Sequence, residues 1–267
     1  MLHIYIVSLK QDIKRREIIS KKLKNLDLKF SFIDAVYGKE LSNEILDSIR
    51  SKSKGKILDR GFLASSGEVG CTLSHIKAYE NILRNNLSWT CVLEDDVILD
   101  ERFKIFINTF RDSFMDPKNL YLLGGQNVFS EVNIIKSFKN NIMIGGQKFS
   151  RTIESEQFIY GACCYLISYD LAKKLVQLFE SSFILADDWN YLSEKNIISE
   201  IYLSRFVDHP SDLYASHLQE ERVLAGASKQ ADNICIKKSF TERVKGAINW
   251  RLRVIKLRLY TYIEKKI

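Results

Sequence analysis

A strand, a helix and a second strand are predicted within the first 36 residues, and this pattern limits the possible folds more than any other. Residues 2–9 and residues 30–36 form two apolar runs typical of strands. Between them lies a basic segment whose apolar residues recur at roughly helical spacing, at Ile13, Ile19, Leu23 and Leu26. Such a βαβ unit places its strands parallel in one sheet, so the sequence predicts an α/β fold.

Periodic apolar patterns continue along most of the chain. They predict helices over residues 67–83, 99–114 and 169–180, a short helix from residue 186, and strands over residues 90–93, 119–124, 158–168 and 198–203. Residues 42–66 are polar and contain a Lys/Ser/Gly run, so we expect a mobile loop there. Residues 136–150 are too weakly patterned for an assignment.

The composition is that of a globular protein. The 267 residues are 46% hydrophobic and 27% charged, which fits one large domain or two small ones. No stretch approaches the ~20 apolar residues that a membrane span needs. In the first residues the apolar run precedes the charged one, the reverse of a secretory signal, so we expect a cytoplasmic protein.

The five cysteines are Cys71, Cys91, Cys163, Cys164 and Cys235, and none forms a C-x-x-C pair. Their odd number and spacing predict reduced thiols in the core, with neither a zinc site nor a disulfide scaffold. The adjacent pair Cys163 and Cys164 lies in an apolar run, which favours packing over redox chemistry.

The net charge of +7 resides in the C-terminal segment, residues 236–267. This segment has ten Lys/Arg against two Glu, whereas the rest of the chain has 30 basic and 31 acidic residues. A nucleic-acid enzyme usually carries positive charge along its main groove as well, so we expect no nucleic-acid partner. The sequence therefore predicts a domain of residues 1–235 and a basic amphipathic helix of residues 236–267.

Apolar residues in this predicted tail helix recur every three or four positions, at Val244, Ile248, Leu252, Ile255, Leu259 and Ile263. Arg and Lys crowd the flanks among Trp250, Tyr260 and Tyr262, a pattern that suits an anionic membrane surface. The alternative is a C-terminal helix that docks its apolar stripe on the body of the protein or on a second subunit of a homodimer.

Three adjacent carboxylates, Glu94, Asp95 and Asp96, directly follow the predicted strand 90–93. Acidic residues are depleted in strands, and ligands of open α/β sheets bind beyond the carboxyl ends of the strands. If the chain stays extended, Glu94 and Asp96 face one way and Asp95 the other. A hard divalent cation, Mg²⁺ or Mn²⁺, would relieve the repulsion and leave positions for a substrate diphosphate. The alternative is a solvated acidic turn without function.

Four blocks in order, SLKQDIKRRE, FIDAVYGKEL, GEVGCTLSHIKAYENIL and VLEDDVIL, resemble glycosyltransferase family 25, the bacterial lipooligosaccharide galactosyltransferases and their relatives. YGACCYLIS, LAKKLV and the Asp187-Asp188-Trp189 stretch are similar to later blocks, so the resemblance covers roughly residues 2–217. It implies a GT-A (Rossmann-like) fold with a mixed, mostly parallel sheet flanked by helices. It also implies a UDP-sugar donor, usually UDP-galactose, a divalent metal and inversion at the anomeric carbon.

The resemblance also implies roles for single residues. Those expected to contact the donor are Ser8, Leu9 and Arg15 in the first-strand block, Asp34 and Ala35 in the second, Lys77 at the diphosphate, and Tyr160 and Gly161 at the sugar. Within the triplet, Asp96 is the expected metal ligand, and Glu94 and Asp95 face ribose, sugar hydroxyls or metal-bound water. Glu94 is also a candidate metal ligand, whereas His75 could serve only to brace its helix.

A second acidic pair, Asp187 and Asp188, offers the general base that an inverting transfer needs. A carboxylate that takes the proton of a sugar hydroxyl accelerates transfer ~10²–10⁴-fold. Asp188 is the first candidate and Asp187 the second, while the alternative for the pair is helix N-capping. A third metal ligand often comes from late in the chain in GT-A enzymes. Of the late histidines His209 and His217, each open to a structural role, His217 is retained as the candidate ligand.

The leading hypothesis is a metal-dependent inverting glycosyltransferase that moves a hexose from a UDP-sugar to a lipooligosaccharide or lipopolysaccharide acceptor. Galactose is the favoured hexose. We expect the enzyme to be peripheral on the inner face of the bacterial inner membrane, where the lipid-linked acceptor would lie. The alternatives are a glucosyltransferase of the same family, a Mg²⁺-dependent nuclease that uses the triplet and the basic tail, and a membrane-surface scaffold without activity.

Overall fold

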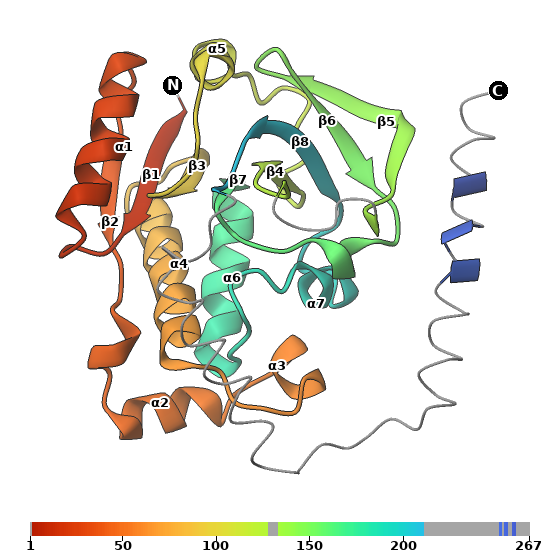
Figure 1. Cartoon of the computed structure of the whole chain (residues 1–267). Coiled ribbons are helices and arrows are strands. Elements are labelled where there is room, and N and C mark those ends of the chain that lie inside the picture. The colour runs from red at the N-terminus through yellow and green to blue at the C-terminus, as the bar shows by residue number, and fades with distance from the viewer. Residues whose placement is uncertain (1, 128–132, 211–250, 253, 256–257, 260–267) are drawn as a thin grey trace.

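The computed structural model describes residues 2–127 and 133–210, with residues 251–252, 254–255 and 258–259 of the tail. An eight-stranded sheet runs through the described body, with helices on both of its faces (Figure 1). The strands are β1 (His3–Ser8), β2 (Ser31–Asp34), β3 (Trp89–Glu94), β4 (Leu120–Gly124), β5 (Lys136–Ile144), β6 (Gln147–Thr152), β7 (Cys164–Ser168) and β8 (Ile201–Val207). The helices are α1 (Ile13–Asn25), η1 (Gly38–Glu40), α2 (Asn43–Arg50), α3 (Lys56–Asp59), α4 (Ser66–Arg84), α5 (Glu101–Thr109), η3 (Glu156–Phe158), α6 (Tyr169–Ser181) and α7 (Trp189–Glu194).

The strand order is β2-β1-β3-β7-β4-β8-β6-β5. Strands β2, β1 and β3 are mutually parallel, β7 is antiparallel to both β3 and β4, and β8 is parallel to β4. Strand β6 is antiparallel to β8 and to β5. Of these strands only β7 and β6 therefore run against the others, and the predicted α/β fold with a mixed, mostly parallel sheet is confirmed.

Each face of the sheet has its own apolar core. On one face, Ile19 and Leu23 of α1 and Phe103 and Phe106 of α5 pack against buried residues of β1 and β3. On the other face, α4, α6 and α7 cover the sheet, and Trp189 is fully buried there. Figure 1 shows α4 and α6 side by side on this second face.

The prediction of a mobile loop over residues 42–66 is wrong. The segment contains α2 and α3, and the Ser42 hydroxyl caps α2 by accepting from the Ile45 amide. Leu46 is the only buried residue of α2, so a predominantly polar sequence still makes an amphipathic helix. Backbone hydrogen bonds from Lys54 to Phe183 and from Phe183 to Lys52 fasten the segment to the body.

Two further segments differ from prediction. Residues 136–150, which gave no assignment, lie in the hairpin of β5 and β6, which turns at Gly145 and Gly146 with positive φ. The predicted strand 158–168 is shorter because η3 occupies its start and Gly161, at φ +77°, interrupts the extended backbone. Strand β7 therefore begins only at Cys164.

The predicted tail helix, residues 236–267, and its boundary with the body lie almost entirely outside the described residues, so both remain predictions. Within the described parts of the chain, no helix combines the length and the apolar character needed to cross a bilayer.

Candidate active site

The carboxyl ends of three parallel strands meet at one edge of the sheet and deliver polar residues there. Ser8 ends β1 opposite Asp34 of β2, and Val7 of β1 pairs with Glu94 of β3. A cavity opens at this edge, and its lining residues are Val7, Ser8, Leu9, Asp12, Arg15, Ala35, Val36, Tyr37, Gly38, Lys39, Gly67, Cys71, Ser74, His75, Glu94, Asp95 and Asp96. This is the position at which open α/β sheets bind ligands.

The acidic triplet divides as its alternation predicts, although the strand does not continue through it. Strand β3 ends at Glu94, and Asp95 and Asp96 form a turn. Glu94 and Asp96 nevertheless lie together, whereas Asp95 contacts the first strand. The turn is fixed because Ile98 and Asp208 form an isolated antiparallel bridge with two backbone hydrogen bonds.

Asp95 is a brace between β1 and α1. Its Oδ2 accepts a hydrogen bond of 2.6 Å from the Ser8 hydroxyl, and its Oδ1 accepts one of 3.1 Å from Arg15 Nη1. Burial raises the pKa of Asp95, and the contacts with Ser8 and Arg15 oppose this shift. Both carboxylate oxygens therefore accept a bond within the protein, Asp95 also lines the cavity, and its predicted contact with the donor remains a prediction.

Asp96 has an unsatisfied carboxylate oxygen. Its Oδ1 is buried and has no hydrogen-bond partner among the described residues, while His209 Nε2 lies 3.7 Å away. Burial and the neighbouring charge of Glu94 raise the pKa of Asp96 to about 6. An orphaned carboxylate oxygen beside a second carboxylate is destabilising unless a cation binds between them.

Glu94, Asp96 and His209 each offer one ligand atom, and these atoms lie within 4.8 Å of one another. His209 Nδ1 is 3.0 Å from the Pro210 carbonyl oxygen, so an Nδ1–H donor there leaves the Nε2 lone pair directed toward Asp96. Two carboxylates and an imidazole fit a divalent ion such as Mn²⁺. The structure therefore brings His209 to the site, while His217, the retained candidate, lies outside the described residues.

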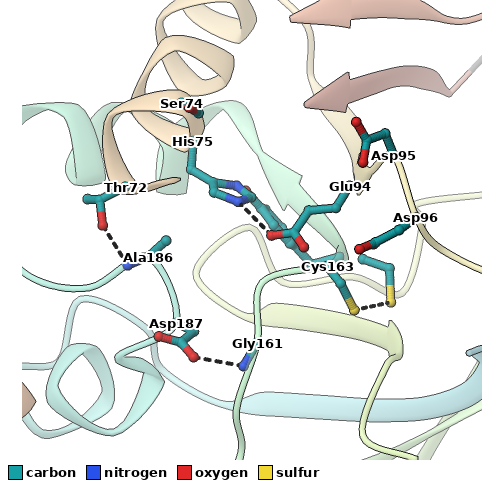
Figure 2. A network of polar contacts seen from close by, with 12 residues as sticks. Thr72, Ser74, His75, Glu94, Asp95, Asp96, Gly161, Cys163, Ala186 and Asp187 are labelled. Atoms are coloured by element: carbon teal, nitrogen blue, oxygen red, sulfur yellow. Dashed lines mark hydrogen bonds and ion pairs between the residues drawn. The ribbon is translucent and has the colours of Figure 1, made fainter. Parts of the chain in front are cut away.

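A series of buried polar contacts through His75 orients Glu94. His75 Nε2 lies 3.4 Å from Glu94 Oε1 (Figure 2). His75 Nδ1 lies 2.7 Å from the Tyr165 hydroxyl. Tyr165 in turn contacts the Tyr79 hydroxyl at 3.1 Å. Burial alone would raise the pKa of Glu94, but the contact with His75, aided by the charges of His209 and Arg15, lowers it below its usual value. Glu94 thus has a fixed orientation and a lowered pKa, which suit a candidate metal ligand.

Asp34 and Lys77 do not line the cavity. Asp34 is exposed, and its Oδ1 pairs with Arg16 Nη2 at 2.6 Å, which lowers the pKa of Asp34. Lys77 Nζ donates to the Asp34 carbonyl oxygen at 2.6 Å. The predicted contacts of Asp34 with uridine and of Lys77 with the diphosphate therefore remain predictions, and in this structure both residues tie the end of β2 to α1 and α4.

Tyr160 and Gly161 precede β7 and are held by neighbouring segments, outside the lining of the cavity. The Gln126 side chain bonds both the carbonyl and the amide of Tyr160. The Gly161 amide donates to Asp187 Oδ2 at 2.8 Å, as Figure 2 shows, and the Gly161 carbonyl accepts from the Trp189 indole. Tyr160 is 38% exposed, and Lys56 Nζ lies 4.8 Å from the centroid of its ring, so the predicted contact of Tyr160 with the sugar remains a prediction.

Asp188 is an N-cap. Its side chain is 1% exposed, accepts from the Tyr191 amide at 3.3 Å and caps α7, and it accepts from the Lys56 amide at 2.7 Å. Burial raises the pKa of Asp188, and the bond from Lys56 opposes the shift. The capping alternative is therefore the one that the structure supports for Asp188. Asp187 is half-buried, and its Oδ2 alone is bonded among the described residues, so it becomes the better candidate base.

Several cavity residues were not singled out from the sequence. Asp12, Tyr37, Gly38, Lys39 and Cys71 all lie in or beside the blocks that carry the family resemblance, which was the available signal. Local sequence does not show that these residues share a cavity. The approach of η1 to α4 brings Gly38, Lys39 and Cys71 together, and Asp12 comes from the start of α1.

The sequence model of glycosyltransferase family 25, described as an LPS biosynthesis protein family, matches residues 1–190. The chain belongs to glycosyltransferase family 25. A Haemophilus influenzae relative, whose name gives glycosyltransferase as a provisional activity, is 26% identical over 88% of this chain and 82% of its own length. Procollagen galactosyltransferase 1-B of Xenopus laevis is 26% identical over 80% of this chain, which spans only 32% of that relative.

Among solved structures, a glycosyltransferase involved in glycosylation of the PBCV-1 major capsid matches with 12% identity and a TM-score of 0.37. The match covers 84% of this chain and 99% of that one, and a TM-score this low carries no argument. The α/β fold and the family membership agree with the GT-A assignment made from the sequence blocks, and membership of this family supports a glycosyltransferase activity.

Proposed function

We propose that this glycosyltransferase moves a hexose from a UDP-sugar to a lipid-linked oligosaccharide of the lipooligosaccharide or lipopolysaccharide type. UDP-galactose is the favoured donor. The observation that carries the proposal is the orphaned Oδ1 of Asp96, which faces His209 beside Glu94 at the carboxyl edge of the parallel strands. A divalent ion held by these three residues would stabilise the charge of the leaving diphosphate.

The chain's own residues supply the remaining binding interactions. Arg15 Nη1 lies 3.1 Å from Asp95 and 3.5 Å from Asp96 at the wall of the cavity, where its guanidinium can also meet a phosphate. Ser8, Leu9 and Ala35 line the same cavity, in agreement with their proposed place at the nucleotide. His75 keeps Glu94 oriented, so this carboxylate does not need to reorganise when the donor binds.

Asp187 is the proposed base for the acceptor hydroxyl. Its Oδ2 is held by the Gly161 amide, which directs the carboxylate without neutralising it. The Ala186 amide bonds the Thr72 hydroxyl of α4 at 3.1 Å, so the segment before Asp187 is fixed to the helix that carries His75 (Figure 2). A carboxylate in this role would accept the hydroxyl proton as the new glycosidic bond forms.

The names of relatives support the choice of donor and acceptor. Galactose is favoured because the Xenopus relative is a procollagen galactosyltransferase, and a lipopolysaccharide-type acceptor by the description of the family. Peripheral attachment to the inner face of the inner membrane rests on the basic tail, whose ten Lys/Arg would meet anionic lipids near a lipid-linked acceptor.

Product analysis tests this function. The full chain is incubated with Mn²⁺, a lipid-linked oligosaccharide acceptor and either UDP-galactose or UDP-glucose, and the purified product is examined by NMR. We expect a β-linked galactose, and product formation at least about 100-fold slower for Asp96→Asn than for the control Glu101→Gln on α5. Transfer of glucose instead would establish the alternative donor. A folded protein that transfers neither sugar, to any acceptor of this class, would contradict the proposal.

A further inference from the structure

A second group of metal-ligand atoms lies beside the first and contains a thiol. Cys71 and His75 are four residues apart in α4 and therefore share one face of the helix, one turn apart. Glu94 approaches this face from the end of β3. One ligand atom from each of Cys71, His75 and Glu94 lies within 4.8 Å of the other two. All three residues line the cavity, and Cys71 is partly exposed, so an ion can reach them from solvent.

The surroundings of His75 prepare its imidazole for a metal. The Tyr165 hydroxyl donates to the Tyr79 hydroxyl at 3.1 Å, so it can accept from His75 Nδ1–H, which is 2.7 Å away. In that tautomer the lone pair of His75 Nε2 is directed toward Glu94 Oε1, 3.4 Å away. In the other tautomer Nε2–H donates to Glu94, so metal binding would replace this proton by the cation. A metal-binding histidine typically has the first of these arrangements, with its second nitrogen donating to an oxygen behind it.

The donor set differs in chemistry from the neighbouring one. Glu94, Asp96 and His209 offer two carboxylates and one imidazole, which suit Mn²⁺ or Mg²⁺. Cys71, His75 and Glu94 offer a thiolate, an imidazole and one carboxylate, which suit Zn²⁺, with a fourth tetrahedral position left for water or a substrate oxygen.

We propose that Cys71, His75 and Glu94 form a zinc site, and that zinc bound there displaces the Mn²⁺-type ion by taking Glu94 from it. The expectation that no cysteine serves a zinc site followed from the absence of C-x-x-C spacing. Here the ligands are a Cys-x-x-x-His pair on one helical face and a carboxylate 19 residues beyond the histidine, a set that C-x-x-C spacing does not detect. The zinc site itself is independent of the proposed transferase function, and only its competition with Mn²⁺ rests on that function.

Cobalt(II) reports on the site directly, because a thiolate ligand gives an intense near-ultraviolet charge-transfer band. The reduced full-length protein is titrated with Co²⁺ and then with Zn²⁺. We expect the band to appear with the parent protein, to disappear when Zn²⁺ replaces Co²⁺, and to be absent from Cys71→Ser and Cys71→Ala. The matched control Cys235→Ser, which removes a thiol outside the described residues, should keep the band. Absence of the band from the folded parent, or its persistence in both folded Cys71 variants, would overturn the zinc site.

Competition is measured by the electron paramagnetic resonance signal of free Mn²⁺. In the parent, added Zn²⁺ should release bound Mn²⁺. Cys71→Ser should require at least about 100-fold more Zn²⁺ for the same release, because it removes a direct ligand. Even residues that only hydrogen-bond to a ligand change metal affinity ~10–100-fold. If the parent and Cys71→Ser release Mn²⁺ at the same Zn²⁺ concentration, the proposed competition is wrong. If the cobalt band forms but the parent binds no Mn²⁺, the proposed catalytic metal site fails while the zinc site stands.

Discussion

The three consecutive carboxylates have three different environments, and these environments assign their roles. Asp95 is bonded to Ser8 and Arg15, Glu94 is oriented by His75, and Asp96 keeps a buried oxygen without a hydrogen-bond partner among the described residues. Only the last two therefore remain available to a cation, and His209 offers a third candidate ligand atom from a segment more than one hundred residues later.

Replacing His209 and His217 one at a time by Gln tests which histidine binds the metal ion. His209→Gln should weaken Mn²⁺ binding about 10-fold or more, because it removes the imidazole that faces Asp96 Oδ1 at 3.7 Å. Isothermal titration calorimetry with Mn²⁺ measures the effect, and His217→Gln is the comparison. If His217→Gln weakens binding and His209→Gln does not, the ligand set derived from the geometry is wrong.

Substitutions of Asp187 and Asp188 should affect different quantities, the rate of transfer for Asp187 and the stability of the fold for Asp188. Asp188→Ala removes the cap of α7 and a partner of the Lys56 amide, so we expect it to lower the free energy of unfolding by about 1–2 kcal/mol. Asp187→Asn keeps an oxygen for the Gly161 amide and should leave the melting temperature unchanged while it lowers kcat ~10²–10⁴-fold. Denaturant unfolding and initial rates measure the two effects. If Asp187→Asn is destabilised but keeps a normal kcat, Asp187 is not the base.

At the residue scale, alternation predicted which members of the triplet lie together, even though the strand ends at Glu94. The sequence did not single out His209, because its position depends on the bridge between Ile98 and Asp208, a contact between distant segments. It ranked Asp188 above Asp187 because an aspartate at a helix start looks the same in sequence whether it caps or reacts.

At the element scale, the cavity depends on the close approach of η1 to α4. A Cβ on Gly70 would lie 2.7 Å from both the Gly38 amide nitrogen and the Val36 carbonyl oxygen, and these are backbone atoms that cannot rotate away. Gly70, the second glycine of the GEVG block, therefore allows the loop that follows β2, which lines the cavity, to rest on α4.

Gly70→Ala tests this contact. We expect a loss of about 1–3 kcal/mol in the free energy of unfolding, because overpacked backbone must shift, and weaker UDP binding because residues 36–38 move. Chemical denaturation and calorimetry give the two values. Glu80→Ala, at an exposed position of the same helix, is the control and should change neither. Normal stability and UDP affinity in Gly70→Ala would show that the contact is looser than described.

Elements with strong periodicity were predictable, and those without it were not. Strand β1, helix α1, helix α4 and strand β3 have apolar patterns that local sequence reveals. The hairpin of β5 and β6 did not give a pattern, because β5 lies at the edge of the sheet and many of its side chains are exposed. Helix α2 was hidden by its polar surface, since only Leu46 is buried.

At the scale of the whole molecule, the first three strands in sheet order build the cavity, and the reversed strand β7 joins them to β4 and β8. The βαβ unit predicted the parallel half of the sheet. The reversal of β7 and the placement of β8 beside β4 were not predictable, because both depend on pairings between distant segments. The acidic triplet at a strand end and the family blocks both predicted a site at this edge of the sheet, where the structure has a cavity.

The basic tail should recruit the whole molecule to anionic membranes. Replacing Arg251, Arg253, Lys256 and Arg258 by Gln in the full chain removes four positive charges, each worth ~1 kcal/mol at an anionic surface. We expect co-sedimentation with phosphatidylglycerol vesicles to be lost while turnover on a soluble acceptor persists. Replacing Lys21 and Lys24 of α1 by Gln is the control. Undiminished sedimentation of the tail variant would contradict the membrane assignment.

The most direct test of the metal-dependent donor site is thermal unfolding of the protein with UDP and Mn²⁺, together and separately. With UDP at about 100 times its Kd, binding adds about 2.7 kcal/mol to the free energy of unfolding. We expect a clear rise in melting temperature for the parent only when both ligands are present, and no such rise for Asp96→Asn. An unchanged melting temperature of the parent with both ligands, or an equal rise in Asp96→Asn, would contradict the site described at the end of β3.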